Sequence, residues 1–246
     1  MAKDNFSSQS KEYALFRPTF PDKLYEFIAR QSPSRGLTWD VATGNGQSAI
    51  RLKNYFEKVI ATDVSSNQLE HAVCMNGVEY RKETAENSSL ENNSVDLVNV
   101  SQAIHWFKFD SFYKEVRRVA KPRAVIAAYC YSLFSTTDDS INDLIRQFYI
   151  DSAPYWDYER KYVDDGYATI PFPFEEIESP SFNMAYQWTI EQLLGYIGTW
   201  SATHRYLKQE GKNMVSPGFE KLLSGHWPPH GTLQVTFPVH MRIGRV

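Results

Sequence analysis

A chain of 246 residues is long enough for one large domain, and its 26 basic and 29 acidic side chains leave a net charge of −3. This weak negative charge provides no broad basic surface for a phosphate backbone, so we expect no nucleic-acid partner. No stretch approaches the ~20 apolar residues that cross a bilayer, and the polar start lacks an apolar signal core, so we expect no membrane partner and a cytoplasmic location.

The first half of the chain alternates between helix-like and strand-like patterns. Pro21 suits the first turn of a helix whose apolar face contains Leu24, Phe27 and Ile28. The expected elements that follow are a buried strand at 37–42, a helix from Gln47, a strand at 59–62 ending on Asp63, a helix capped by Ser65 with Gln68 in a capping box, strands at 78–82 and 95–100, a helix at 110–120, a turn at Lys121-Pro122, and a strand at 124–131. This alternation predicts an α/β fold with a mostly parallel, Rossmann-like sheet and helices on both faces.

The pattern changes after residue 131. A helix is expected at 138–150, followed by a segment at 155–174 that is rich in Tyr, Trp and Pro. The alternation then resumes with a strand at 182–188, a helix from Ile190 to about Leu207, and a last strand at 233–243. We interpret residues 1–246 as a single domain in which 132–175 is an inserted helical cap.

A glycine turn follows the first strand, in the segment Asp40-Val41-Ala42-Thr43-Gly44-Asn45-Gly46. Glycine permits the unusual φ angles of such a turn and allows the backbone to approach a ligand closely. The helix that follows offers unpaired N–H groups to a ligand carboxylate or phosphate. Because an ordinary strand–helix turn has the same composition, the turn alone leaves cofactor binding undecided.

A carboxylate closes the second strand. Asp63 lies 17 residues after Gly46, close to the spacing of about 20 expected for an acid that binds a ribose. An ionised carboxylate accepts hydrogen bonds from both ribose hydroxyls, and such charge-assisted bonds are strong. The alternative is an Asp that only caps a turn, but together with the glycine turn the pattern favours a nucleoside-binding site.

Two cofactors fit this pattern. The segment 44–49 also matches G-x-G-x-x-A, which is typical of nicotinamide dinucleotide sites. Asp40 argues against a pyrophosphate there, because its charge would repel the phosphates but attract the amino group of a methionine moiety. No Tyr in the chain has a Lys four residues later, so one common hydride-transfer pair is missing. S-adenosylmethionine (SAM) is therefore favoured over a dinucleotide.

Several segments resemble the motifs of class I SAM-dependent methyltransferases. Residues 40–46 resemble the family's glycine motif, 63–69 its acidic second motif, 84–86 its adenine-side segment and 101–107 the motif after the fourth strand. Tyr13, Arg17-Pro18, Pro21, 194–196 and 199–202 resemble the methyltransferase type 11 proteins grouped with trans-aconitate methyltransferase.

The resemblance implies a seven-stranded sheet with an antiparallel last strand and a SAM cofactor. It implies that Gly44 and Gly46 pass under the methionine part, Asp63 binds the ribose, Ala85 and Glu86 lie by the adenine, and the 132–175 cap lies on the acceptor side. The implied cofactor-binding residues are Asp40, Ala42, Gly44, Gly46, Asp63, Val64, Gln68, Ala85, Glu86, Ser101 and Gln102.

The chain departs from the family pattern at two turns. Ala42 replaces the first glycine of the motif, and a left-handed conformation there would cost an alanine about 1 kcal/mol or more. Arg123-Ala124 replaces the glycine pair commonly seen before the fifth strand. The first departure bears on SAM affinity, and the second bears on a distant turn.

Methyl transfer depends mainly on alignment of the reacting atoms, and a carboxylate acceptor needs no base. His105 is the candidate base for a hydroxyl or amine acceptor, although a buried structural histidine is the more common case. The candidate substrate-binding residues are Tyr13, Arg17, Trp106, Tyr155 and Trp200; Arg17 is expected to pair with an acceptor carboxylate and the aromatic residues to line a pocket or the core.

No metal site is expected. Cys74 and Cys130 are far apart in the sequence, and Pro228-Pro229 prevents His226 and His230 from sharing a helical face. The sequence thus predicts a SAM-dependent methyltransferase for a small-molecule acceptor, with its oligomeric state open. A non-catalytic SAM-binding protein and an NAD-dependent oxidoreductase are the alternatives.

Overall fold

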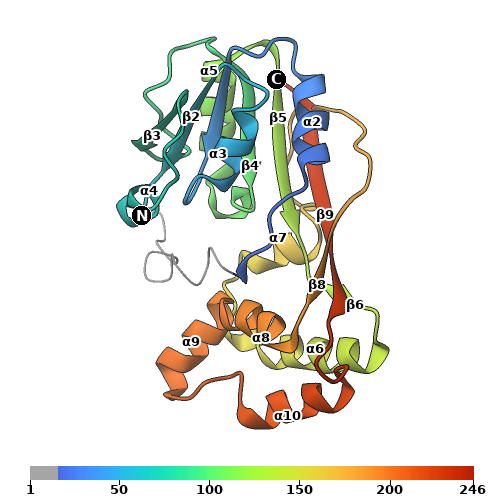
Figure 1. The fold of residues 1–246 in the computed structure, drawn as a ribbon. Coiled ribbons are helices and arrows are strands. Elements are labelled where there is room, and N and C mark those ends of the chain that lie inside the picture. Colours follow the sequence, from blue (N-terminus) through green and yellow to red (C-terminus); the bar gives the residue numbers. More distant parts are fainter. Residues whose placement is uncertain (1–15) are drawn as a thin grey trace.

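The computed structural model describes residues 16–246, so Tyr13 lies outside the described residues (Figure 1). The strands are β1 (Leu37–Val41), β2 (Lys58–Asp63), β3 (Val78–Lys82), β4 (Val95–Ser101), β5 (Ala120–Tyr131), β6 (Ser135–Thr136), β7 (Glu175–Glu176), β8 (Phe182–Trp188) and β9 (Leu233–Arg245). The helices are α2 (Asp22–Gln31), α3 (Gln47–Leu52), α4 (Ser66–Glu70), α5 (Phe109–Val119), α6 (Asp139–Asp151), α7 (Arg160–Asp164), α8 (Ile190–Gly198), α9 (Ser201–Glu210) and α10 (Pro217–His226), with 3-10 turns η1 (Ile104–Trp106) and η2 (Ala153–Tyr155).

The strands form one sheet in the order β3-β2-β1-β4-β5-β9-β6, and β7 and β8 also pair with β9. The pairs from β3 to β5 are parallel, whereas β9 runs antiparallel to β5 and β8. The α/β fold with an antiparallel last strand is therefore confirmed. The expected count of seven strands is exceeded within residues 16–246, because two-residue strands β6 and β7 add to the edge of β9.

Strand β5 shows why the sheet is buried on both sides. Its side chains alternate between two apolar cores: Ala127 and Tyr129 pack in one, and Ala128 and Cys130 pack in the other. Successive strand residues point to opposite faces, so a strand that is apolar throughout needs cover on both. Leu24 and Leu52 of α2 and α3 contribute to the first core, and Phe112 of α5 contributes to the second.

The entry into β5 differs from the expected turn. Lys121-Pro122 lies inside β5, where the pairing with β4 jumps from Val95↔Ala120 to Leu97↔Val125. Arg123 takes up this irregularity with a φ of 64°, a left-handed angle that favours glycine. The missing glycine pair therefore marks a real backbone constraint, although it lies within a strand bulge.

The helix expected from Ile190 to about Leu207 is two helices. Helix α8 ends at Gly198, and Trp200 takes an extended conformation before α9 begins. The Thr199 hydroxyl donates to the carbonyl of Tyr196 at 2.6 Å, which satisfies the end of α8 locally. Because the apolar periodicity continues across the break, the sequence pattern predicts one continuous helix.

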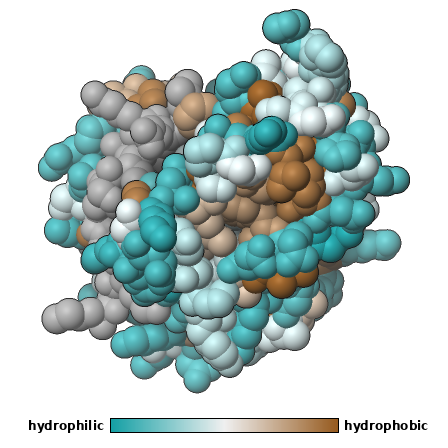
Figure 2. Space-filling model, turned by 90° about the horizontal axis from the view of Figure 1, so that it is seen from below, coloured by the Kyte–Doolittle hydropathy of each residue, from teal (hydrophilic) through white to brown (hydrophobic). Residues whose placement is uncertain are grey.

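Helices α6, α8, α9 and α10 gather at the end of the sheet opposite the chain's C-terminus (Figure 1). Helix α10 contacts α6 and α8, and α9 contacts η2, so residues after 175 contribute to this helical end as well as 132–175. Seen from this end, the surface shows an apolar area surrounded by hydrophilic residues (Figure 2). Of residues 16–246, no helix is both long enough and apolar enough to cross a membrane.

Candidate functional site

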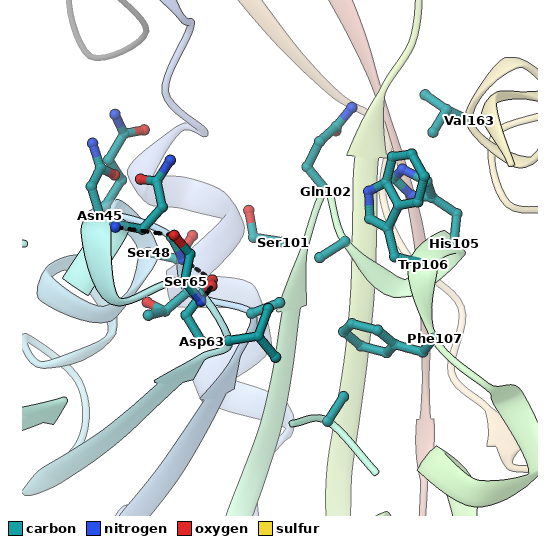
Figure 3. Close-up of a pocket in the computed structure, with 18 of the residues that line it drawn as sticks. Asn45, Ser48, Asp63, Ser65, Ser101, Gln102, His105, Trp106, Phe107 and Val163 are labelled. Carbon is teal, nitrogen blue, oxygen red and sulfur yellow. Dashed lines mark hydrogen bonds between the residues drawn. The ribbon is translucent and has the colours of Figure 1, made fainter. Parts of the chain in front are cut away.

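A cavity of about 750 Å³ lies at the carboxyl ends of β1, β2 and β4. The strand order reverses between β1 and β4, and ligands of open α/β sheets bind at such a switch point. We call the wall made by the glycine turn, Asp63, the loop after β3 and the end of β4 the turn half. We call the wall made by residues 17–20, His105-Trp106, Tyr131 and the segment 156–163 the cap half. Figure 3 shows Asn45, Ser48 and Asp63 on one side of the cavity, and His105, Trp106 and Val163 on the other.

The glycine turn and Asp63 meet in the turn half. The Gly44 N–H donates to Oδ2 of Asp63 at 2.8 Å, and the Ser65 N–H donates to Oδ1 at 2.9 Å. These two backbone donors fix the orientation of the carboxylate. Asp63 also lines the cavity, so an oriented carboxylate borders the space beside the turn.

Three residues of the turn have left-handed backbones. The φ angles are 52° at Ala42, 58° at Gly44 and 84° at Gly46. A Cβ atom on Gly46 would lie 2.2 Å from the Tyr80 hydroxyl, whereas one on Gly44 would have Gln68 Oε1 at 3.9 Å as its nearest neighbour. The left-handed conformation expected for Ala42 is confirmed, and its methyl group borders the cavity.

Asp40 lies beneath the cavity and is not part of its wall. It is fully buried, and it accepts hydrogen bonds from the Asn99 side-chain amide at 2.7 Å and from the Thr43 hydroxyl. Burial, together with the nearby charge of Asp63, raises the pKa of the Asp40 carboxyl to about 6. Asp40 thus stabilises the turn from below, and the expected contact with a ligand ammonium group is absent from this geometry.

The other residues predicted for the turn half line the cavity, with Gly46 as the exception: Val64, Gln68, Ala85, Glu86, Ser101 and Gln102. Ser65 caps α4 as expected, because its hydroxyl accepts from the Gln68 N–H. The Gln102 side chain is engaged: its oxygen accepts from the Tyr131 N–H at 2.8 Å, and its nitrogen donates to the Tyr131 carbonyl at 3.4 Å. Gln102 therefore joins the ends of β4 and β5, while its backbone, with a φ of 55°, turns beside the cavity.

His105 and Trp106 follow β4 and line the cavity opposite Asp63 (Figure 3). Nδ1 of His105 is hydrogen-bonded to the Tyr167 hydroxyl at 3.0 Å. Burial, together with the charge of Arg160, lowers the pKa of His105 to about 3. A histidine with such a pKa is neutral at physiological pH and is a weak base.

Arg17 lies in the cap half, but its guanidinium is engaged by the protein. Nη1 donates to the Tyr131 hydroxyl at 3.1 Å, and Nη2 donates to the Thr199 carbonyl at 3.0 Å. The guanidinium also lies over the Tyr196 ring. The expected pairing of Arg17 with an acceptor carboxylate is therefore not favoured by this geometry.

The structure does not bring Tyr155 and Trp200 to the cavity. Neither residue lines the cavity: the Tyr155 hydroxyl donates to Glu210 at 3.3 Å, and Trp200 is buried among aromatic rings of the helical end. Trp156, the neighbour of Tyr155, is the aromatic residue of this segment that lines the cavity. A one-residue difference reverses the direction of a side chain, and the irregular segment gave no periodicity from which to predict it.

Tyr131 and Arg160 are among the polar residues of the cap half that sequence reasoning missed. Tyr131 ends a strand that reads as core, and Arg160 belongs to a five-residue helix without a motif. No group of three His, Cys, Asp or Glu suited to a metal ion occurs in the part of the chain that the structure describes.

Comparisons with known proteins agree with this geometry. A family model described as a methyltransferase domain matches residues 39–128. A Dictyostelium discoideum protein named "putative methyltransferase" is 34% identical over 249 residues, covering 98% of this chain and 95% of that protein. A Saccharomyces cerevisiae protein named a probable S-adenosylmethionine-dependent methyltransferase is 26% identical over 144 residues, covering 52% of this chain and 47% of that protein.

One solved structure is similar over nearly the whole fold. It is described as a "putative type II methyltransferase" from Anaeromyxobacter dehalogenans, and it is 36% identical with a TM-score of 0.86. The match covers 94% of this chain and 98% of that chain, so the similarity includes the helical end as well as the sheet.

Proposed function

We propose that this chain, which belongs to the SAM-dependent methyltransferases, transfers a methyl group from SAM to a small-molecule acceptor bound in the cap half of the cavity. The observation that carries the proposal is the orientation of Asp63. Its two oxygens are held by the N–H groups of Gly44 and Ser65, so that an oriented carboxylate borders the cavity, and a carboxylate is a strong acceptor for two adjacent ribose hydroxyls.

The rest of the turn half fits the same cofactor. The backbone at Gly44 approaches the cavity with little obstruction, and the Ala85-Glu86 segment provides a wall for a flat base. When bound, SAM supplies an electrophilic methyl group on a sulfonium ion. Ser101 and Gln102 lie between the two halves, so the methyl group is expected to face the cap half from there (Figure 3).

The size of the cavity supports a small acceptor. About 750 Å³ falls within the usual range of small-molecule sites, and the cofactor would take up part of it. Phe20, Tyr131 and Trp156 give the remaining space aromatic walls. Alignment of a bound acceptor and exclusion of water are the contributions that such walls make to methyl transfer.

The chemistry of the cap half favours a carboxylate acceptor. The low pKa of His105 makes it a poor general base, and a hydroxyl or ammonium acceptor would have to lose a proton. A carboxylate is already ionised at physiological pH and needs no base. His105 would then position η1 through its bond to Tyr167.

The proposal is tested in two steps with the purified full chain. Calorimetric titration with SAM and S-adenosylhomocysteine (SAH) measures cofactor binding, and NAD is the comparison ligand. Incubation with methyl-labelled SAM and a panel of small carboxylates, alcohols and amines then measures transfer. Saturation with SAH at 100 times its Kd would stabilise the fold by about 2.7 kcal/mol. Absence of SAM and SAH binding would refute the proposal, and binding without transfer to any acceptor would favour a non-catalytic SAM-binding protein.

A further inference from the structure

We infer that Arg160 binds an anionic group of the acceptor that is separate from the methylated atom, and that it thereby determines acceptor specificity. This inference rests on the proposed function and deepens it. It comes from a contrast between the two arginines of the cap half. The guanidinium of Arg17 donates hydrogen bonds to the protein, whereas Nη1 and Nη2 of Arg160 donate none to residues 16–246.

Arg160 is held rigidly. Its Nε donates to the Tyr149 hydroxyl at 2.8 Å and to Oδ1 of Asp164 at 2.9 Å, and its guanidinium carbon lies 4.5 Å from the centre of the Trp156 ring. The side chain is only 19% exposed. These contacts fix the plane of the guanidinium without using its outer edge.

The outer edge has no hydrogen-bond partner among the described residues. Nη1 and Nη2 of Arg160 make no hydrogen bond to any of residues 16–246, although Arg160 lines the cavity. This edge is at the wall of the cavity, and a carboxylate or phosphate matches its parallel N–H groups. An anionic ligand group would satisfy them.

A second donor lies in the same half. The Tyr131 hydroxyl oxygen accepts from Arg17 at 3.1 Å, and its own proton has no acceptor within the described residues. Tyr131 also lines the cavity. Two side chains, on β5 and α7, therefore offer N–H or O–H donors to one ligand.

Acidic side chains near Arg160 do not cancel this preference. Asp164 contacts Arg160 through Nε only, and it is 43% exposed. Asp157 is paired with Arg205 at 2.7 Å. Glu159 also borders the cavity, so a cationic acceptor is the competing case that a test has to separate.

The group bound by Arg160 should not be the nucleophile. A bidentate guanidinium takes up lone pairs on both oxygens and withdraws negative charge, which weakens attack on the methyl group. Val163, on the same helix as Arg160, lies across the cavity from Asp63 (Figure 3). The anionic group would thus anchor the far end of the acceptor, while the nucleophile faces Ser101 and Gln102.

The test uses the SAH-loaded full chain and matched probes. Succinate and glutarate are compared with their monoamides, with phenylphosphonate and with amines of the same length, by calorimetry or ligand-observed NMR. The variants are Arg160→Gln and Arg160→Lys, and the control is Arg146→Gln, an exposed arginine of α6 paired with Asp143.

We expect at least one anionic probe to bind, with affinity about tenfold or more lower in Arg160→Gln, partly restored in Arg160→Lys and unchanged in Arg146→Gln. The carboxylate and phosphonate arms show which anion is preferred, and SAH affinity should be equal in all variants. Equal probe binding by Arg160→Gln and the wild type, no anion binding at roughly 10 mM, or amine binding that is lost in Glu159→Gln would overturn the inference. A failure of SAH itself to bind would instead count against the proposed function.

Discussion

The two halves of the cavity are built in different ways. The turn half comes mostly from the ends of β1, β2 and β4, and backbone N–H groups fix its main side chain, Asp63. The cap half combines Arg17, Tyr131 and the pair Trp156 and Arg160, which come from three distant parts of the sequence and are fixed by side-chain contacts. A backbone-built wall suits one unchanging cofactor, whereas a side-chain wall can change its acceptor without a change of fold.

The largest expected effect is the loss of cofactor binding when Asp63 is replaced. Asp63→Ala should weaken SAH binding about 100-fold or more, because two charge-assisted hydrogen bonds to the ribose contribute at least about 3 kcal/mol together. Trp156→Ala, on the cap half, should leave SAH affinity within a factor of about two, since distant sites act independently. Calorimetry measures both, with the exposed Asp143→Ala as control. An unchanged SAH affinity in Asp63→Ala would mean that the two halves have been assigned wrongly.

Gly46→Ala should have the next largest effect, on stability. Its Cβ would lie 2.2 Å from the Tyr80 hydroxyl, and its φ of 84° is unfavourable for any residue with a Cβ. Together these predict a loss of about 2–3 kcal/mol in the free energy of unfolding, measured by urea denaturation. In a double-mutant cycle, Tyr80→Ala should recover the steric part and leave the backbone part. Additive losses would show that the Tyr80 ring moves aside at little cost.

Asp40 predicts a dependence of stability on pH. Burial raises the pKa of its carboxyl from 3.8 to about 6 in the folded state. The folded protein therefore binds more protons than the unfolded chain between about pH 4 and pH 6, so this group's contribution to the free energy of unfolding falls as pH rises through that window. Above it, the ionised carboxylate costs about 3 kcal/mol.

The difference between wild type and Asp40→Asn isolates this contribution from those of other groups. Urea denaturation from pH 4 to pH 7 should show the variant gaining on the wild type as pH rises, by about 2 kcal/mol over this pH range. Asp143→Asn, a surface change, should give a curve parallel to that of the wild type. Parallel curves for Asp40→Asn would show that relaxation around Thr43 and Asn99 already accommodates the charge.

The same contrast explains what could be predicted from the sequence. The strands, the glycine turn and the meeting of Gly44 with Asp63 follow from local rules: apolar runs, φ requirements and the common edge of parallel strands. Gln102 shows the limit within the turn half, because its amide pairs with Tyr131 of the neighbouring strand. The apolar periodicity of a strand indicates which residues are buried, but it does not indicate which residue of a neighbouring strand a side chain contacts.

The cap half was much less predictable. Arg160 depends on Tyr149, Trp156 and Asp164, and these contacts exist only once α6 and α7 are packed. The break between α8 and α9 was hidden because the apolar pattern continues through Trp200, which is buried. Tertiary packing, not local preference, decides which aromatic residue of such a segment faces the cavity.

Ala42→Gly gives the smallest expected effect, a gain in stability. Ala42 has a φ of 52°, where a Cβ costs about 1–2 kcal/mol, and glycine gives back part of this through its greater freedom when unfolded. The net expectation is a free energy of unfolding higher by up to about 1 kcal/mol, measured by urea denaturation. Ala49→Gly, in helix α3 next to the turn, should lower it by about 1 kcal/mol or more. Equal losses in both variants would show that the Ala42 methyl group contributes packing that outweighs its backbone strain. Ala42→Gly and Gly46→Ala, four residues apart in one loop, would then both lower stability, a result that φ alone does not explain.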